Sequence, residues 1–192
     1  MKAFRWEIFK KGAGDSLMNE TDLNKFMDIL NSREERAKKQ VELLNMYPYT
    51  LISFTLNIPG INKNSDIYSS IHDNGMFSLV NALNTGKIEI KNIEFFRKST
   101  GNEGFISVNS DPISVKILTT GIENEHPLGR IFDIDVFDKD HNQLSRTDLG
   151  LEPRKCLMCG KEARICIREK NHTYEELIER IEQICRDFFD NR

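Results

Sequence analysis

The sequence has 192 residues, of which 39% are hydrophobic, and a formal net charge of −3 at pH 7. This length predicts one domain, over residues 1–192, with a core of its own, and the negative charge argues against a general nucleic-acid binder. Charged residues interrupt the first 14 positions and no later run is apolar enough to span a bilayer, so we expect a soluble cytoplasmic protein without membrane contacts.

Two helices are expected in the first quarter of the chain. Residues 23–30 place apolar side chains at helical spacing, and this first helix is expected to stop at Asn31. Ser32 and Glu35 have the spacing of a capping box, which predicts that a second helix begins there and runs until Pro48. Residues 1–20 precede this pattern as an extension without an assigned role.

The second expected helix places polar side chains beside its apolar stripe. The stripe consists of Ala37, Val41 and Leu44. Because side chains three or four positions apart share a helix face, Arg33, Arg36 and Gln40 lie next to the stripe and border the core.

The middle of the chain favours strands. Residues 52–58 alternate apolar and polar side chains, which predicts a half-buried strand closed by Pro59 and Gly60. Residues 65–83 predict a helix that Gly75 weakens and that stops near Gly86. Further extended segments are expected over residues 87–97, 104–108 and 114–119, then over 130–137, with a turn over 138–142 and a return strand over 143–146.

The last helix begins with a second capping box, formed by Thr173 and Glu176. Residues 154–172, just before it, are polar with little periodicity and predict a small separate element that contains three cysteines and a histidine. The expected fold class is α+β, with a mixed or mainly antiparallel central sheet flanked by helices and this small Cys/His element before the C-terminal helix.

Asp133 and Asp135 are the first candidates for chemistry. On a strand they share one face, while Phe132, Ile134 and Val136 pack behind them. Neighbouring carboxylates repel each other unless a cation lies between them, and Mg²⁺ prefers carboxylate oxygens and bridges to substrate phosphates. The alternative is a solvated strand face that carries two acids.

A second candidate site has the spacing of metal ligands. A close cysteine pair followed by a third cysteine and a histidine can surround a tetrahedral Zn²⁺ in a structural site. The alternative is three reduced thiols and a surface histidine. These four residues are Cys156, Cys159, Cys166 and His172.

The same segment is locally basic, with six Lys and Arg residues against two Glu between positions 154 and 170. Such a patch is either an ordinary solvated surface or a site for phosphate or an acidic partner.

Several motifs together carry a resemblance to a known family. They are the run from Asn124 to Val136, Leu144-Ser-Arg146, Asp148-Leu-Gly150, Pro153 to Gly160, and Cys166-x-Arg168. Ser32 to Ala37 with Gln40, and Leu51 to Thr55 through Pro59-Gly60, extend the match over about residues 30 to 185. The sequence thereby resembles the apo-citrate lyase phosphoribosyl-dephospho-CoA transferases, also called holo-citrate lyase synthases.

This resemblance implies a nucleotidyltransferase-type reaction on two partners. The donor is 2′-(5″-triphosphoribosyl)-3′-dephospho-CoA, and the acceptor is a serine of the acyl carrier protein subunit of citrate lyase, with release of pyrophosphate. Such chemistry assigns Mg²⁺ to Asp133 and Asp135, which with Arg130 form the expected catalytic set. The expected substrate-binding residues are Arg33, Arg36, Gln40, Arg146 and Arg154.

The resemblance leaves the general base unassigned, with Asp148 and His126 as candidates. Two other functions remain open at this point. One is a related carrier-protein transferase that acts on another lyase, and the other is a non-catalytic zinc-containing interaction module.

Overall fold

A computed structural model describes residues 19–190, so the extension predicted over residues 1–20 lies almost wholly outside the described residues. Within them, β1 (Thr50–Leu56), β2 (Glu89–Phe96), β3 (Glu103–Asn109) and β4 (Phe132–Phe137) form one antiparallel sheet in the order β2-β3-β1-β4. This arrangement confirms the predicted α+β class with a mainly antiparallel sheet.

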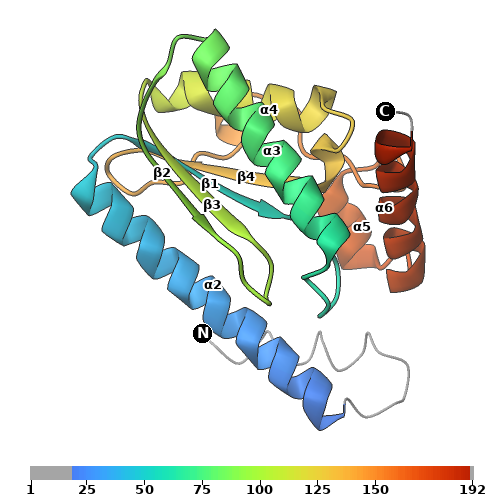
Figure 1. Ribbon diagram of the computed structural model, residues 1–192. Helices are drawn as coiled ribbons and strands as arrows, with labels where there is room; N and C mark the ends of the chain where they lie inside the picture. The colour runs from blue at the N-terminus through green and yellow to red at the C-terminus, as the bar shows by residue number, and fades with distance from the viewer. Residues whose placement is uncertain (1–18, 191–192) are drawn as a thin grey trace.

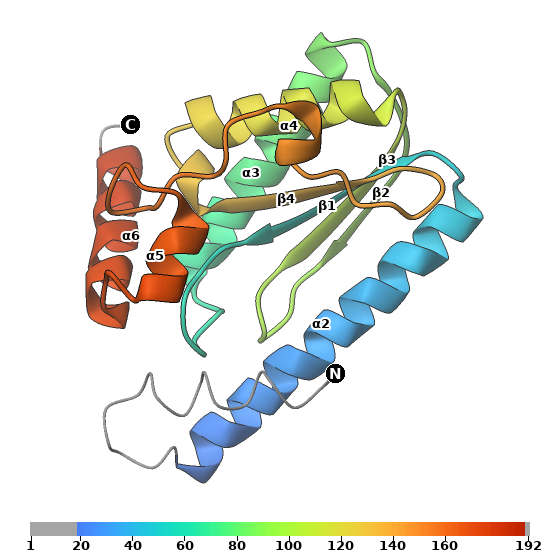
Figure 2. The same ribbon diagram turned by 180° about the vertical axis from the view of Figure 1, so that it is seen from behind.

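Helices cover both faces of the sheet. Helices α3 (Asp66–Thr85) and α4 (Pro112–Glu125) lie on one face, and α2 (Glu20–Met46) crosses the other (Figures 1 and 2). The short α5 (Ala163–Glu169) and the final α6 (Tyr174–Phe189) stand together at one end of the molecule.

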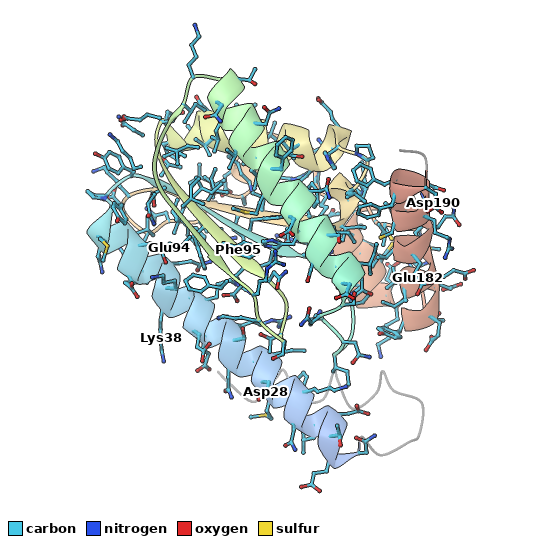
Figure 3. All side chains as sticks on the ribbon, viewed as in Figure 1. Asp28, Lys38, Glu94, Phe95, Glu182 and Asp190 are labelled. Atoms are coloured by element: carbon cyan, nitrogen blue, oxygen red, sulfur yellow. The ribbon has the colours of Figure 1, made fainter. Side chains whose placement is uncertain are left out.

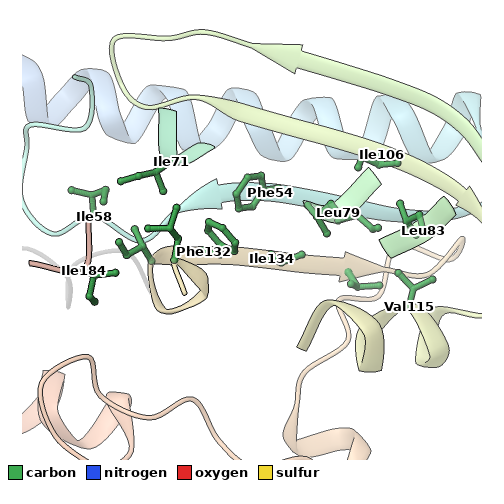
Figure 4. Close-up of a cluster of buried hydrophobic side chains, with 14 of the residues drawn as sticks. Phe54, Ile58, Ile71, Leu79, Leu83, Ile106, Val115, Phe132, Ile134 and Ile184 are labelled. Carbon is green, nitrogen blue, oxygen red and sulfur yellow. The ribbon is translucent and has the colours of Figure 1, made fainter. Parts of the chain in front are cut away.

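The main core lies between the sheet and α3 (Figure 4). Alternate residues of β1 and β4 point into it, including Phe54 and Phe132, which meet edge to face. A Cβ added at Gly75 would lie 2.3 Å from the Phe54 ring. Gly75, which lowers the helix propensity of this segment, therefore lets α3 approach the sheet closely.

The predicted break between two N-terminal helices is wrong. Helix α2 is continuous through Asn31 and is capped at Asn19. Ser32 lies inside this helix and is not an N-cap. Its side chain is buried, and its hydroxyl donates to Glu103 (3.4 Å) and accepts a hydrogen bond from Thr100 (2.8 Å). The Ser-x-x-Glu spacing is a local signal that a helix interior also satisfies, and tertiary partners decide which role the serine takes.

The predicted apolar stripe of this helix is also wrong in part. Val41 is 48% exposed and Ala37 is exposed, while Leu44 is buried as expected. The inward face contains Arg36 and Gln40 between its buried apolar ends. Helix α2 therefore covers a polar region of the sheet.

Two predicted strands are absent from the described structure. Residues 114–119 belong to α4, whose N-cap Asp111 accepts a hydrogen bond from the Ser114 amide (2.8 Å) and whose first turn contains Pro112. These start signals outweigh the β-branched residues that follow. Residues 143–146 form only one isolated bridge, between Phe137 and Gln143, instead of a return strand.

The remaining elements confirm the sequence predictions with small shifts in their ends. Helix α2 ends at Met46 with Tyr47 as its C-cap before Pro48, α3 ends at Thr85 with Gly86 as its C-cap, and β4 begins two residues later than expected. Helix α6 has the predicted capping box, in which Thr173 and Glu176 each bond the other's backbone amide.

Candidate active site

Asp133 and Asp135 lie on the face of β4 that looks toward α2. Their strand partners on β1 are Thr55 and Ser53, respectively, which face the same way. The intervening Ile134 is buried on the opposite face, so the predicted alternation is confirmed. Two carboxylates and two hydroxyls thus form a polar area on this face of the sheet.

Side chains close the free edge of β4 and hold this strand in place. The Ile134 amide donates to the Glu123 carboxylate (3.1 Å), and the Ile134 carbonyl accepts from Lys116 Nζ (3.0 Å). Arg154 donates to the Phe132 carbonyl. An edge strand normally exposes these groups, so their pairing keeps the two carboxylates on a rigid element.

Burial, followed by the charge of Asp133, raises the pKa of Asp135 to about 6. Lys116, Arg36 and a hydrogen bond from Gln143 Nε2 (2.7 Å) oppose this rise. At neutral pH the carboxylate is therefore ionised at an energetic cost to the fold. A divalent cation between the two aspartates would remove that cost.

We predict that Asp135→Asn stabilises the protein at neutral pH in the absence of added magnesium. The folded pKa exceeds the ordinary value of 3.8, so the folded state binds more protons between pH 3.8 and about 6, and wild-type stability falls as pH rises through that window. Above pH 6 the variant should gain about 1 to 2 kcal/mol, after discounting for partial exposure, and below pH 3.8 nothing. Urea unfolding at pH 3.5 and 7.5 measures this; a gain that is equal at both values contradicts it.

A cavity of about 110 Å³ lies beside Asp133. Its walls come from the middle of α2, the loop after β1, the start of α3 and the β2–β3 turn. Three cationic side chains line it, namely Arg33, Arg36 and Lys63. The cavity is therefore suited to an anionic ligand.

A hydrogen-bond network positions the inward side chains of α2. Glu103, almost fully buried, pairs with Arg36 (3.2 Å) and with Lys98 (3.0 Å). One turn further along the helix, Gln40 Nε2 donates to the Ser53 hydroxyl (2.9 Å). The predicted residues Arg36 and Gln40 thus reach the polar area of the sheet from the opposite wall.

The other predicted arginines lie around the end and edge of β4. Arg146 pairs with the buried Glu123, and Arg130 donates to the Cys156 carbonyl (2.9 Å). Arg154 contacts Asp133 directly (3.2 Å). Arg154 therefore reaches the carboxylate pair, whereas Arg130 and Arg146 do not line the cavity.

The two candidate bases do not lie at the cavity. The His126 ring packs on Phe132, on the face of β4 opposite to Asp133, and its Nδ1 accepts the Leu128 amide (3.0 Å). Asp148 is exposed and accepts a hydrogen bond from the Ser145 amide (3.3 Å).

The sequence analysis missed Lys63, which lines the cavity, and Glu103, which pairs with Arg36 beside it. Lys63 stands in a polar loop after Pro59 and Gly60 that carried no periodic signal, and Glu103 begins a strand. The one signal in the sequence was the polar loop itself, which lies between the end of a predicted strand and the start of a predicted helix, where binding residues are common.

The four predicted zinc ligands come together. Their ligand atoms all lie within 4.8 Å of one another, with Cys159 Sγ 3.5 Å from Cys166 Sγ and 3.4 Å from His172 Nε2. Tetrahedral thiolates around zinc, at Zn–S distances of about 2.3 Å, stand about 3.8 Å apart. This Cys₃His cluster can hold a metal ion such as zinc, and its donor set leaves no open position.

Fold and site together define an α+β protein with a cation-lined cavity beside a carboxylate pair, next to a Cys₃His cluster. Within the part of the chain that the structure describes, every helix is too short or too polar to cross a membrane.

Comparison with known proteins gives the family. The family model described as apo-citrate lyase phosphoribosyl-dephospho-CoA transferase matches residues 24–188. Curated proteins of that name from Escherichia coli O1:K1 / APEC and from Shigella boydii serotype 18 are each 34% identical over 160 residues, which cover 83% of this chain and 87% of theirs. The chain belongs to this family and is a transferase enzyme.

Proposed function

We propose that this protein transfers the prosthetic group of 2′-(5″-triphosphoribosyl)-3′-dephospho-CoA to a serine of the acyl carrier protein subunit of citrate lyase, with release of pyrophosphate. Residues 1–192 would act as one transferase domain in the cytoplasm. The observation that carries the proposal is the cation-lined cavity that adjoins Asp133, in a chain of this family. A triphosphate substrate needs that combination of cations and metal-binding carboxylates.

The proposed reaction is a displacement at phosphorus. The serine oxygen attacks the phosphorus nearest the ribose and forms a phosphodiester as the bond to pyrophosphate breaks. Little covalent chemistry is required of the protein, so catalysis rests on in-line positioning and on neutralising charge on the triphosphate. Arg33 and Arg36 supply fixed positive charge from α2, and Arg154 reaches the same area through its contact with Asp133.

Asp133 and Asp135 would hold Mg²⁺. Their oxygen donors suit this ion, and a cation between them would offset the burial and the Asp133 charge that raise the pKa of Asp135. A bound Mg²⁺ would neutralise developing charge on the phosphate oxygens. The aspartates themselves fix the place of that charge on a strand whose edge bonds are satisfied.

The Cys₃His element would be the docking site for the carrier protein. We propose that a structural Zn²⁺ orders residues 154–172 and that the basic residues there dock an acidic carrier surface. Three of them are exposed on or beside α5, namely Lys161, Arg164 and Arg168. The donations from Arg130 to the Cys156 carbonyl and from Arg154 to the Phe132 carbonyl connect this element to β4.

The direct test mixes the purified protein with apo carrier subunit, the triphosphoribosyl substrate and Mg²⁺, followed by mass spectrometry of the carrier. We expect one prosthetic group on one serine and an equal amount of pyrophosphate. A carrier of unchanged mass would refute the proposal. The alternative of a non-catalytic interaction module is set aside by the family, and a competing carrier from another lyase tests the remaining alternative.

We predict that Arg33→Lys and Arg130→Lys each lose activity. At Arg33 an ammonium cannot reproduce the paired N–H donors that a guanidinium offers to phosphate, and at Arg130 it cannot reproduce the donation to the Lys155 and Cys156 carbonyls. The loss should be about tenfold or more for Arg33, which lines the cavity. Arg180→Lys on the exposed side of α6 is the matched control and should keep full activity. Steady-state rates with varied triphosphate substrate measure this; unchanged rate and affinity in both variants would remove the arginines from the site.

A further inference from the structure

We propose that the cavity beside Asp133 binds the terminal pyrophosphate portion of a triphosphate, and that Lys63 is the residue that contacts it. This inference rests on the proposed function for the identity of the triphosphate, but the binding of pyrophosphate itself can be tested without the transfer reaction.

Lys63 lines the cavity on the wall opposite to α2. It lies in the loop between β1 and α3, where its Nζ donates to the Ile58 carbonyl. Arg33 and Arg36 reach the same cavity from α2, on the other wall. Among the residues that line the cavity, Asp133 is the acidic one, and Arg36 is in addition paired with the buried Glu103 (3.2 Å).

The electrostatic balance of the cavity favours an anion. Burial and the charges of Arg33 and Arg36 lower the pKa of Lys63 to about 8, and Asp133 offsets this only in part. Because Asp133 compensates the positive charge of Lys63 only in part, a multiply charged anion in the cavity would stabilise the charged form of this lysine. Tyr68 at the start of α3 also faces the cavity and carries no compensating charge at neutral pH.

Neutral hydrogen-bonding groups complete the lining. They come from the end of β1, the loop after it, the start of α3 and the β2–β3 turn, and they are Thr55, Asn57, Asn64, Ser69, Thr100 and Asn102. Asn102 is oriented by a hydrogen bond from its Nδ2 to the Ser69 hydroxyl (3.3 Å). Hydroxyl and amide donors beside cations are the groups that hold phosphate oxygens.

Size selects which part of the substrate enters. The cavity has a volume of about 110 Å³. A site for a whole drug-sized ligand occupies about 300 to 1,000 Å³. The cavity therefore takes a small charged end of the substrate, and the dephospho-CoA portion must lie outside it.

The position of Asp133 agrees with this orientation. It lines the cavity and is also 46% exposed on the open face of β4. The bond that breaks in the proposed reaction joins the departing pyrophosphate to the phosphorus that stays with the ribose. Pyrophosphate in the cavity would place that bond next to the carboxylate pair, with the acceptor serine on the open side.

Isothermal titration of the full chain with inorganic pyrophosphate, with and without Mg²⁺, tests the inference. We expect Lys63→Gln to weaken binding about tenfold or more and Lys63→Arg to restore part of it. The matched control is Lys38→Gln, because Lys38 is exposed on α2 and points away from the sheet (Figure 3), so its loss should leave binding unchanged. Thermal unfolding of each variant confirms that it folds.

Each outcome decides one of the two proposals. Wild-type affinity for pyrophosphate in folded Lys63→Gln would overturn the inference, as would a wild-type protein that modifies the carrier but does not bind pyrophosphate. Pyrophosphate binding that depends on Lys63, in a protein that leaves the carrier unmodified, would support the cavity assignment and refute the proposed transfer.

Discussion

Replacing Asp133 or Asp135 by Asn is expected to lower the rate of prosthetic-group transfer by about three orders of magnitude. Asparagine keeps the size of the side chain and one acceptor oxygen, but it removes a negative charge from the proposed Mg²⁺ site. In the Asp135→Asn variant, Gln143 Nε2 can still donate to the amide oxygen of the new side chain, so the local hydrogen bond survives. The effect should therefore appear in the rate and not in the fold.

Initial rates of carrier modification at several Mg²⁺ concentrations measure this effect, with circular dichroism as a check on the fold. Asp140→Asn is the matched control, because Asp140 is an exposed aspartate in the turn that follows β4. The control should retain the wild-type rate. Near-normal turnover in both Asp133→Asn and Asp135→Asn would remove the pair from the mechanism.

The second large effect is expected from loss of the metal in the Cys₃His cluster. Residues 154–172 contain few apolar side chains, so a metal crosslink is needed to offset the conformational entropy of ordering them. Elemental analysis should find about one zinc per chain, and Cys159→Ser should abolish zinc binding near neutral pH. Structural zinc sites contribute about 10 kcal/mol or more of apparent binding energy, so the segment should unfold without the ion.

Hydrogen exchange resolved by segment tests where the damage occurs. In Cys159→Ser, residues 154–172 should lose protection first, while β4 keeps most of its protection. Because Arg154 bonds both Phe132 and Asp133, transfer activity should then fall as a secondary effect. Cys185→Ala is the control for metal content, since Cys185 lies in the core on α6 and should not affect zinc. A metal-free protein with full protection of residues 154–172 would refute structural zinc.

The sequence by itself determined the features that depend on neighbouring residues. The alternation around Asp133 and Asp135 and the capping box of α6 rest on contacts within a few positions, and the four ligands of the Cys₃His cluster lie in one short segment between positions 156 and 172. Such patterns carry their own geometry, so the strand face and the Cys₃His cluster followed from them directly.

Tertiary structure alone decided the rest of the site. Ser32 could begin a helix or sit inside one, and its buried contact with Glu103, 71 positions away, settles the second role. Lys63 joins Arg33 and Asp133 only because the loop after β1 folds back against α2. The guanidinium of Arg146 could bind phosphate, but its ion pair with Glu123 holds it at the edge of β4. The sequence gives the charge of each side chain, but packing between segments far apart in the chain determines which group that side chain contacts. The same packing forms the cavity.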